Sequence, residues 1–340
     1  MTSTPTLATT HDALLLDLDG TVYEGGRPIA GVLEVLTATS LPMQFVTNNA
    51  SRAPHKVAEQ LQGIGYNATA DDVMTSAQAA IELAAAHVPA GSAVLVLGTD
   101  SFKDLARAAG YAVVDSADDK PAAVFQGHNP NTGWAQLSEA ALAIANGALY
   151  LASNLDTTLP MERGRYVGNG SMVAAVVSAT GVEPISAGKP LPPMFFSAAA
   201  KLNSTSPLAV GDRLDTDIAG GVAANMDTYM VISGVSGHFD TLFAPPAHRP
   251  KYLGATMAGL TQPVSSVTPG PQGGFLAHRD GAAVVVSGDG SIASGEHAAA
   301  NLLLTAAEVV WATNDDTNPN AITEIRASSD AAQAALDQWR

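Results

Sequence analysis

Short apolar runs that end in polar residues recur along the chain. The clearest run is ALLL at 13–16, which passes directly into Asp17 and Asp19 and then Gly20. A buried parallel strand is apolar on both faces, and ligands of open α/β sheets bind outside the carboxyl ends of such strands. Residues two apart in a strand face the same way, so Asp17 and Asp19 can point into one crevice. The run therefore predicts a buried strand with a carboxylate pair at its end.

Two other interpretations apply to the same residues. Aspartate, glycine and threonine are common in turns, so the segment could be an ordinary turn. An EF-hand calcium loop that begins at Asp17 would need glycine at its sixth position and glutamate at its twelfth, where this chain has Val22 and Pro28. The sequence thus disfavours a calcium loop, and partners elsewhere in the chain must decide between a turn and a site.

A second apolar run ends in the same way. The segment PLAVG at 207–211 leads into Asp212, and Asp217 follows five positions later. If the two strands are parallel neighbours, Asp212 arrives beside Asp17 and Asp19. Three acidic groups in one cleft repel one another strongly unless a cation lies among them. Oxygen ligands favour a hard ion, and Mg²⁺ suits a site with few carboxylates and a substrate phosphate.

Two further segments carry groups that bind phosphate. The run at 43–46 ends in Thr47, Asn48 and Asn49, and the segment ISAGKP places Lys189 after a glycine. Hydroxyl, amide and ammonium groups are suitable donors to phosphate oxygens. Asn48 and Asn49 could equally cap a helix that is expected to begin near 52–54. We expect Asp215, by contrast, to be a solvent-facing loop residue.

In this order, the four segments resemble motifs one to four of the haloacid dehalogenase superfamily of phosphohydrolases, over about residues 10–260. The strings VTNNASR and GNGSMVAA resemble the branch that holds p-nitrophenyl phosphate, phosphoglycolate and glycerol-3-phosphate phosphatases. The resemblance implies a Mg²⁺-dependent phosphatase of small phosphomonoesters, with glycerol 3-phosphate as the favoured substrate. The alternatives are 2-phosphoglycolate, nucleotide or sugar monophosphates as substrates, a phosphotransferase, and a sensing or scaffold protein.

The resemblance also implies roles for individual residues. Asp17 is the expected nucleophile, which forms an aspartyl phosphate, and Asp19 is the expected acid and base. Lys189 is expected to neutralise charge on the nucleophile and the phosphate. The residues expected to contact the substrate in the core are Gly20, Thr47, Asn48 and Asn49. The expected Mg²⁺ ligands are Asp17, the backbone carbonyl of Asp19, and Asp212, with Asp217 orienting them from behind.

The patterning predicts an α/β fold with a Rossmann-like parallel-sheet core. The core is expected at 1–79 and 185–262, with a large α/β cap domain inserted at 80–184, because a loop of that length must fold by itself. The segment 263–274 is rich in proline, glycine and serine and predicts a linker. A small C-terminal α+β module with the order β-β-α-β-α is expected at 275–340.

The cap is expected to set substrate selectivity. Asn154 and Asp156 follow another apolar run, and Arg163 and Arg165 lie in the segment that returns to the core. We treat Asn154, Asp156 and Arg163 as candidate substrate contacts, although Asn-x-Asp is often a turn and exposed arginines are usually only solvated. The string GNGSMV at 168–173 lacks the third small residue of a dinucleotide fingerprint. It is expected to follow a loop and to bring backbone amides near the substrate or cap the next helix.

The C-terminal module loosely resembles a truncated acetyltransferase module, but it has no pyrophosphate-binding loop. We therefore expect it to dock, stabilise or dimerise the protein rather than bind coenzyme A.

Composition excludes several classes of protein and disfavours several kinds of partner. The absence of cysteine excludes disulfides, zinc thiolate sites and thiol catalysis. The net charge of −16 opposes nucleic acid and anionic membranes as partners. No basic region followed by an apolar stretch opens the chain, and no run approaches the length of a membrane span, so we expect a cytoplasmic protein. The expected partner is a small-molecule phosphomonoester, and the sequence leaves a homodimer open.

Overall fold

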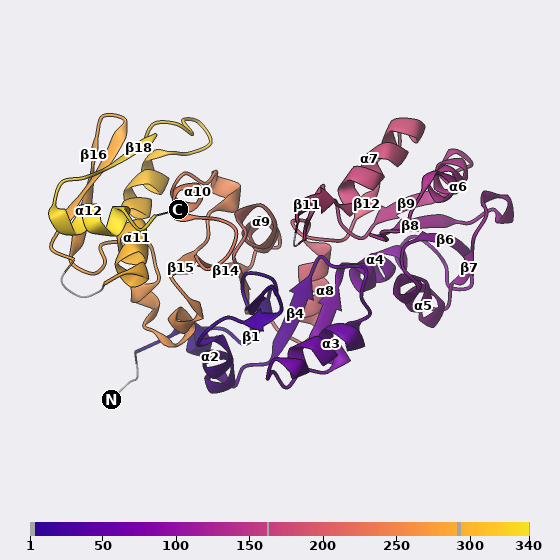
Figure 1. Ribbon diagram of the computed structural model, residues 1–340, viewed down its shortest axis with the longest axis horizontal. Coiled ribbons are helices and arrows are strands. Elements are labelled where there is room, and N and C mark those ends of the chain that lie inside the picture. Colours follow the sequence, from indigo (N-terminus) through magenta and orange to yellow (C-terminus); the bar gives the residue numbers. More distant parts are fainter. Residues whose placement is uncertain (1–3, 162, 291–293, 340) are drawn as a thin grey trace. The chain divides into compact units, whose positions relative to one another are not determined.

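The computed structural model describes residues 4–161, 163–290 and 294–339 (Figure 1). The contacts divide the chain into two compact units, one formed by 1–44 and 201–340 and the other by 45–200. The two units divide at 44/45 and 200/201, whereas the sequence led us to expect domain boundaries at 79/80 and 184/185. The expected domain boundaries stay a prediction. The architecture is α/β, as the sequence predicted.

Parallel strands form the sheet of the first unit. Strand β1 pairs with β13, β13 with β14, and β14 with β15. Ala13 lies opposite Pro207 and Leu16 opposite Val210, and all residues of β1 and β13 are buried. Two segments almost two hundred positions apart therefore end at the same edge of one sheet, as predicted. The strands are β1 (Ala13–Leu16), β13 (Pro207–Gly211), β14 (Asp227–Val231) and β15 (Tyr252–Gly254).

Short helices and one hairpin complete this part of the first unit. Strands β2 (Tyr23–Glu24) and β3 (Arg27–Pro28) form the small hairpin, turning through two glycines with positive φ. The α-helices are α1 (Leu7–Thr10), α2 (Val32–Thr39), α9 (Ala219–Ala223) and α10 (His238–Leu242). A π-helical turn, η3 (Leu214–Ile218), leads from β13 into α9. The 3₁₀ turns are η4 (Pro246–His248), η5 (Met257–Thr261) and η6 (Val264–Ser266).

The C-terminal segment has the predicted order β-β-α-β-α. Strands β16 and β17 are antiparallel around Gly281, whose φ is +63°, and β17 pairs with β18 in parallel. Figure 1 shows α11 and α12 beside these strands, in the part coloured orange to yellow. The elements are β16 (Phe275–Asp280), β17 (Ala283–Gly288), α11 (Glu296–Thr313), β18 (Glu324–Ala327) and α12 (Asp330–Leu336).

This C-terminal segment shares a hydrophobic core with the parallel sheet. Met230 and Leu253 belong to the same buried cluster as Phe275, Leu303 and Trp339. Each large apolar side chain buried in this way stabilises the fold by about 1.5–3 kcal/mol. The expected linker is also ordered in part, because η6 lies within it and Val267 is buried. The segment is therefore an integral part of the first unit, which agrees with the expected stabilising role.

The second unit contains a larger sheet of its own, strand β5 and the part of β4 from residue 45 onward. Strands β4 (Met43–Thr47) and β5 (Val73–Thr75) are parallel. The larger sheet is parallel and has the order β12-β9-β8-β6-β7. Its strands are β6 (Ala93–Leu97), β7 (Ala112–Val114), β8 (Ala123–Gln126), β9 (Leu149–Ala152) and β12 (Ile185–Ser186). The helices are α3 (Pro54–Gly63), α4 (Ser76–Ala84), α5 (Asp100–Ala108), α6 (Trp134–Ala145), α7 (Asn169–Thr180) and α8 (Pro193–Lys201), with 3₁₀ turns η1 (Ala70–Asp72) and η2 (Ala117–Asp119).

Two details of this unit differ from the sequence prediction. The segment with Arg163 and Arg165 forms an antiparallel hairpin of β10 (Thr158–Met161) and β11 (Gly164–Val167). The string GNGSMV therefore follows a strand directly, and not a loop as expected. Gly168, which has no side chain, is the N-cap residue of α7. A hairpin of largely exposed strands was missed because it lacks the apolar run that marked the buried strands.

Within the described part of the chain, no helix combines the length and the apolar character that crossing a membrane requires.

Candidate active site

Three aspartates of the first unit gather at the carboxyl ends of β1 and β13. Asp17, Asp212 and Asp217 each offer a carboxylate oxygen, and these oxygens lie within 4.8 Å of one another. Asp212 and Asp217 are buried, whereas Asp17 is half-buried. Carboxylates this close repel one another, and a divalent cation removes the repulsion. The donor set of carboxylate oxygens, without a sulfur or imidazole group, fits Mg²⁺.

Asp212 is fixed by bonds and by close packing. Thr21 Oγ1 donates to its Oδ1 at 3.2 Å, and the Val235 amide donates to its Oδ2 at 2.6 Å. Gly20 and Gly234 approach so closely that a Cβ on either residue would overlap the Asp212 carboxylate. Gly20 also has a φ of +88°, which side-chain-bearing residues rarely adopt. The two glycines therefore form a cradle that only residues without a side chain can supply.

The loop after β14 is a part of this site that the sequence prediction missed. Besides the Val235 bond, the Ser236 amide donates to the Asp212 carbonyl at 3.1 Å. Ser233 Oγ donates to the Gly20 carbonyl at 2.8 Å and so ties the loop to the first motif. The sequence does contain a signal for this loop. The apolar run of β14 is followed by SGVSG, so this strand also ends at small polar residues.

Asp19 lies exposed just beyond Asp17. Leu18, between them, is 1% exposed, which is the alternation predicted for a strand end. The Gly20 amide donates to the Tyr23 carbonyl at 2.8 Å, so the chain turns back directly after Asp19. Tyr23 Oη approaches the Asp19 carboxylate at 3.4 Å. Asp19 is thus an accessible carboxyl group placed two residues from the candidate nucleophile.

The two aspartates that follow Asp212 have different environments. Asp217 Oδ2 accepts from the Arg213 amide at 3.1 Å, which orients this buried carboxylate within the cluster. Asp215 is outside the cluster, and its side chain is 60% exposed. Partial burial works to raise the pKa of Asp215, but the ion pair with Arg213 at 2.8 Å outweighs it and holds that pKa below the usual range. Asp215 is therefore a solvent-facing residue, as expected.

The phosphate-binding candidates of the second unit also lie together. Lys189 is buried, and its Nζ donates to the Val46 carbonyl at 3.1 Å, beside Thr47 at the end of β4. Thr47 is buried, and its Oγ1 accepts from the Asn49 amide at 3.2 Å. A hydroxyl and an ammonium group from segments far apart in sequence therefore share one end of β4. Their contact with phosphate stays a prediction.

The helix-capping alternative for Asn48 and Asn49 is wrong. Helix α3 has Ala53 as its N-cap, with no side-chain cap bond. Asn49 is exposed, and its Oδ1 accepts from the Ser51 amide at 2.9 Å in a local turn. Asn48 instead bonds to residues distant in sequence, including Asp156, whose Oδ2 accepts from its Nδ2 at 3.1 Å.

The cap candidates fall into two groups. Asn154 is buried and donates to the Asn48 carbonyl at 2.8 Å, so Asn154 and Asp156 both contact the loop after β4. Arg163 and Arg165 are exposed on the β10–β11 hairpin. Hydrogen bonds thus bring the first two residues to the candidate phosphate loop, whereas the arginines lie on the hairpin. Substrate contacts of all four stay predictions.

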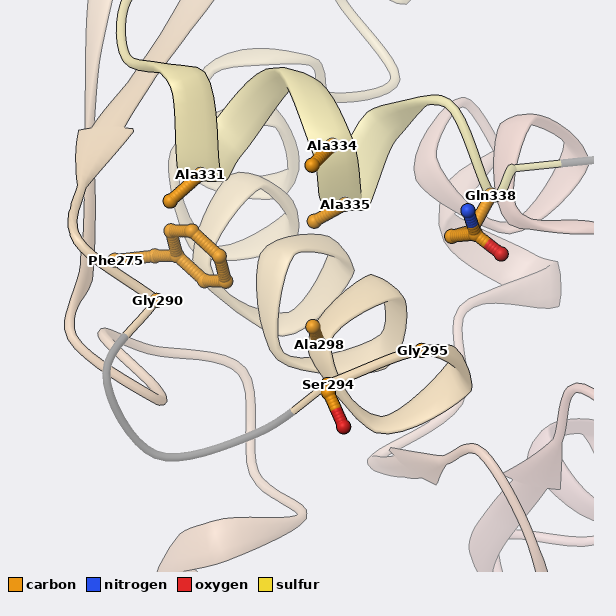
Figure 2. A pocket seen from close by; sticks show the side chains of 9 residues that line it. All are labelled: Phe275, Gly290, Ser294, Gly295, Ala298, Ala331, Ala334, Ala335 and Gln338. Carbon is orange, nitrogen blue, oxygen red and sulfur yellow. The ribbon is translucent and has the colours of Figure 1, made fainter.

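A pocket elsewhere in the first unit lacks this chemistry. This pocket has a volume of about 330 Å³. Figure 2 shows Phe275, alanines of α11 and α12, and Gln338 among the residues that line it. None of the candidate catalytic or metal-binding residues lines it. We therefore place the candidate active site at the strand ends.

Comparison with known families agrees with this arrangement of motifs. A model described as haloacid dehalogenase-like hydrolase matches residues 14–112, and a second HAD-hydrolase-like model matches 186–260. A D-glycerol 3-phosphate phosphatase of Mycobacterium tuberculosis is 41% identical over 98% of this chain and 95% of its own length. The chain belongs to the haloacid dehalogenase-like hydrolases. The family and the enzyme class expected from the sequence are confirmed.

Two more relatives extend the comparison of this haloacid dehalogenase-like hydrolase. A crystal structure of a glycerol phosphate phosphatase from Mycobacterium tuberculosis in complex with magnesium has a TM-score of 0.90 and 40% identity, covering 99% of each chain. An acid sugar phosphatase of Staphylococcus saprophyticus is 36% identical over 66% of this chain and 88% of its own length.

Proposed function

We propose that this chain is a Mg²⁺-dependent phosphatase that hydrolyses glycerol 3-phosphate to glycerol and inorganic phosphate. The observation that carries the proposal is the cluster of Asp17, Asp212 and Asp217 at the ends of two paired parallel strands. The specific substrate is supported by 41% identity, over nearly the whole chain, to a D-glycerol 3-phosphate phosphatase.

The carboxylates of Asp17 and Asp212 would hold the metal, together with the Asp19 backbone carbonyl, and Asp217 would orient them. Buried oxygen donors that converge in this way fit Mg²⁺, and the magnesium complex of a relative supports the same ion. When bound, the ion supplies positive charge that offsets the charge of the phosphate and of the carboxylates.

In the first step, a carboxylate oxygen of Asp17 attacks phosphorus, and the bond from phosphorus to the glycerol oxygen breaks. Asp19 gives its proton to that oxygen, so glycerol leaves as a neutral alcohol. In the second step, Asp19 takes a proton from water as the water oxygen attacks phosphorus. The bond from phosphorus to Asp17 breaks, which releases phosphate and restores both carboxyl groups. The exposed position of Asp19 two residues from Asp17 suits this exchange of protons with a ligand.

Thr47, the backbone amide of Asn48, and Lys189 would bind the phosphate oxygens. Phosphoryl transfer depends mainly on positioning and charge stabilisation, and these groups provide hydrogen bonds and one positive charge. The net charge of −16 opposes long-range attraction of an anionic substrate. The attraction must therefore come from these local groups and the metal.

The proposed role of the cap is to exclude water and to contact the glycerol moiety, and which cap residues make that contact stays a prediction. A homodimer, a cytoplasmic location and the absence of nucleic-acid partners stay predictions.

A panel of phosphomonoesters tests the proposed substrate. With saturating Mg²⁺, we expect kcat/KM for glycerol 3-phosphate to exceed that for 2-phosphoglycolate, for sugar phosphates and for nucleotide monophosphates by about tenfold or more, the discrimination that one well-placed polar contact provides. Released inorganic phosphate is the readout. A sugar phosphate at the top of the ranking would instead favour the activity named for the staphylococcal relative. Phosphoryl transfer to a second substrate without phosphate release would point to a phosphotransferase.

A further inference from the structure

The side chain of Asn48 forms a clamp on the backbone of Lys189. Asn48 Oδ1 accepts from the Lys189 amide at 2.9 Å, and Asn48 Nδ2 donates to the Lys189 carbonyl at 3.0 Å. The second Nδ2 hydrogen goes to Asp156 Oδ2 at 3.1 Å. An asparagine side chain has two donor hydrogens and one acceptor oxygen, so these three bonds use both hydrogens. The orientation of the amide is also fixed, because the reverse orientation would oppose donor to donor at the Lys189 amide.

This bonding changes what Asn48 can do for a phosphate. Both Nδ2 hydrogens are already committed, so the side chain has no donor left for a phosphate oxygen. The Asn48 carbonyl is occupied as well, because it accepts from Ser76 Oγ at 2.7 Å and from Asn154 Nδ2 at 2.8 Å. The backbone amide remains as the group of Asn48 that could bind phosphate.

The clamp holds Lys189 close to the end of β4. A lysine side chain has many rotamers, and ordering it requires that both of its ends be fixed. Its backbone is held by Asn48, and its Nζ donates to the Val46 carbonyl at 3.1 Å. Gly188 allows this close approach, since a Cβ there would lie 2.8 Å from Asn48 Oδ1. The Asn48 bonds therefore hold one end of the lysine, and the Val46 carbonyl accepts from the other.

A chain of amides links the clamp to the GNGS segment. Asn169, the first residue of α7, donates to the Asn154 carbonyl at 2.7 Å, and Asn154 donates to the Asn48 carbonyl. Asn154 and Asn169 are both buried, so a lost bond here would leave a polar group without water. This chain of bonds gives the GNGS segment a structural role that the sequence pattern did not reveal.

We propose that Asn48 is a positioning residue for Lys189, and that Asp156 acts in the cap as the acceptor that orients the Asn48 amide. The inference rests on the proposed function for the role of Lys189, but the clamp itself consists of the hydrogen bonds given above. Beside the Asp156 carboxylate, the clamp requires that the side chain at position 48 be uncharged. Aspartate at position 48 would keep the acceptor for the Lys189 amide, lose both donors and face the Asp156 carboxylate.

The test exchanges the two ends of the Asn48–Asp156 bond. N48D should lower kcat for glycerol 3-phosphate and weaken inorganic phosphate binding, each by about 10- to 100-fold, the usual loss for a hydrogen bond that involves a charged group. In N48D/D156N the amide donor lies at position 156 and the carboxylate acceptor at position 48, and the like charges are gone. The kcat of this double variant should be at least about tenfold higher than that of N48D, and its phosphate binding should be stronger by a similar factor. N67D makes the same chemical change at an exposed position of the same unit and should stay within about twofold of the wild type.

Isothermal titration with inorganic phosphate in the presence of Mg²⁺ separates positioning from unfolding. A purely structural role of Asn48 would lower the number of binding sites and the melting temperature while the Kd of the remaining sites stays that of the wild type. If N48D does not fold, N48S provides the single variant, because serine has no charge and too short a side chain for the clamp.

Single variants with wild-type kcat and phosphate Kd would overturn the inference, and so would a double variant no better than N48D. If Asp156 binds glycerol instead, D156N will raise KM in both backgrounds and leave the phosphate Kd unchanged, which also contradicts the inference. The proposed function fails separately, if the wild-type protein releases no phosphate from glycerol 3-phosphate. The phosphate Kd series still decides the role of Asn48 in that case.

Discussion

Asp17→Asn should lower kcat for glycerol 3-phosphate by roughly four orders of magnitude or more, the scale seen when a covalent nucleophile is removed. The amide has almost the same shape as the carboxylate, but its oxygen is a far weaker nucleophile. Asp17 lies within 4.8 Å of two buried carboxylates, so the substitution also removes part of their repulsion. The melting temperature without metal should therefore equal or exceed that of the wild type.

The measurement is phosphate release at saturating substrate and Mg²⁺, with the melting temperature as a check on folding. Asp215→Asn is the matched control, because it makes the same change at a mostly exposed aspartate outside the cluster. If Asp17→Asn turns over glycerol 3-phosphate at a rate close to that of the wild type, the covalent mechanism is refuted.

Asp19→Asn should have an effect that depends on the leaving group. With glycerol 3-phosphate, kcat should fall by about 10²- to 10⁴-fold, because the alkoxide needs a proton as it leaves. With p-nitrophenyl phosphate, the first step needs little acid catalysis because nitrophenolate is a good leaving group. The second step still lacks its base. Stopped-flow absorbance should therefore show a fast release of about one p-nitrophenol per enzyme, followed by slow turnover.

Equal losses for both substrates, without the fast phase, would contradict the dual role of Asp19. A folded variant is again required, and the melting temperature gives that control. Because Asp19 is exposed and Tyr23 Oη lies 3.4 Å from its carboxylate, we expect little change in stability.

The sequence predicted that Asp17 and Asp212 lie together because their positions follow from a simple pattern. The runs at β1 and β13 are wholly buried and therefore wholly apolar, so their ends were easy to locate. Parallel pairing then brings Asp17 and Asp212 to one edge, since the strands match residue for residue. The register itself could not be derived from the sequence, because a continuous apolar run carries no alternation that would fix it.

The parts that were missed depend on contacts between distant segments. Asparagine is a common helix-capping residue, so the sequence suggested a cap at Asn48. The hydrogen bonds of its side chain become evident only when Lys189 and Asp156 are placed in space. Val235 contributes a backbone amide, which has no side-chain signature. The segment 263–274 looks like a linker because of its proline and glycine, yet Val267 is buried. Such packing depends on the tertiary structure and not on local propensity.

On the proposed mechanism, Asp17 and Asp212, from two paired strands, bind one divalent cation that the reaction requires. The most direct measurement is the rate of phosphate release from glycerol 3-phosphate as a function of Mg²⁺ concentration for wild type, Asp212→Asn and Asp215→Asn. Loss of a metal-binding carboxylate weakens metal affinity by about tenfold or more. We expect no activity after chelation. The Asp212→Asn curve should be shifted at least this far to higher Mg²⁺ and reach a lower plateau, and the Asp215→Asn curve should match that of the wild type. Phosphate release that needs no divalent cation, or an Asp212→Asn curve that coincides with the wild type, would contradict the proposed mechanism.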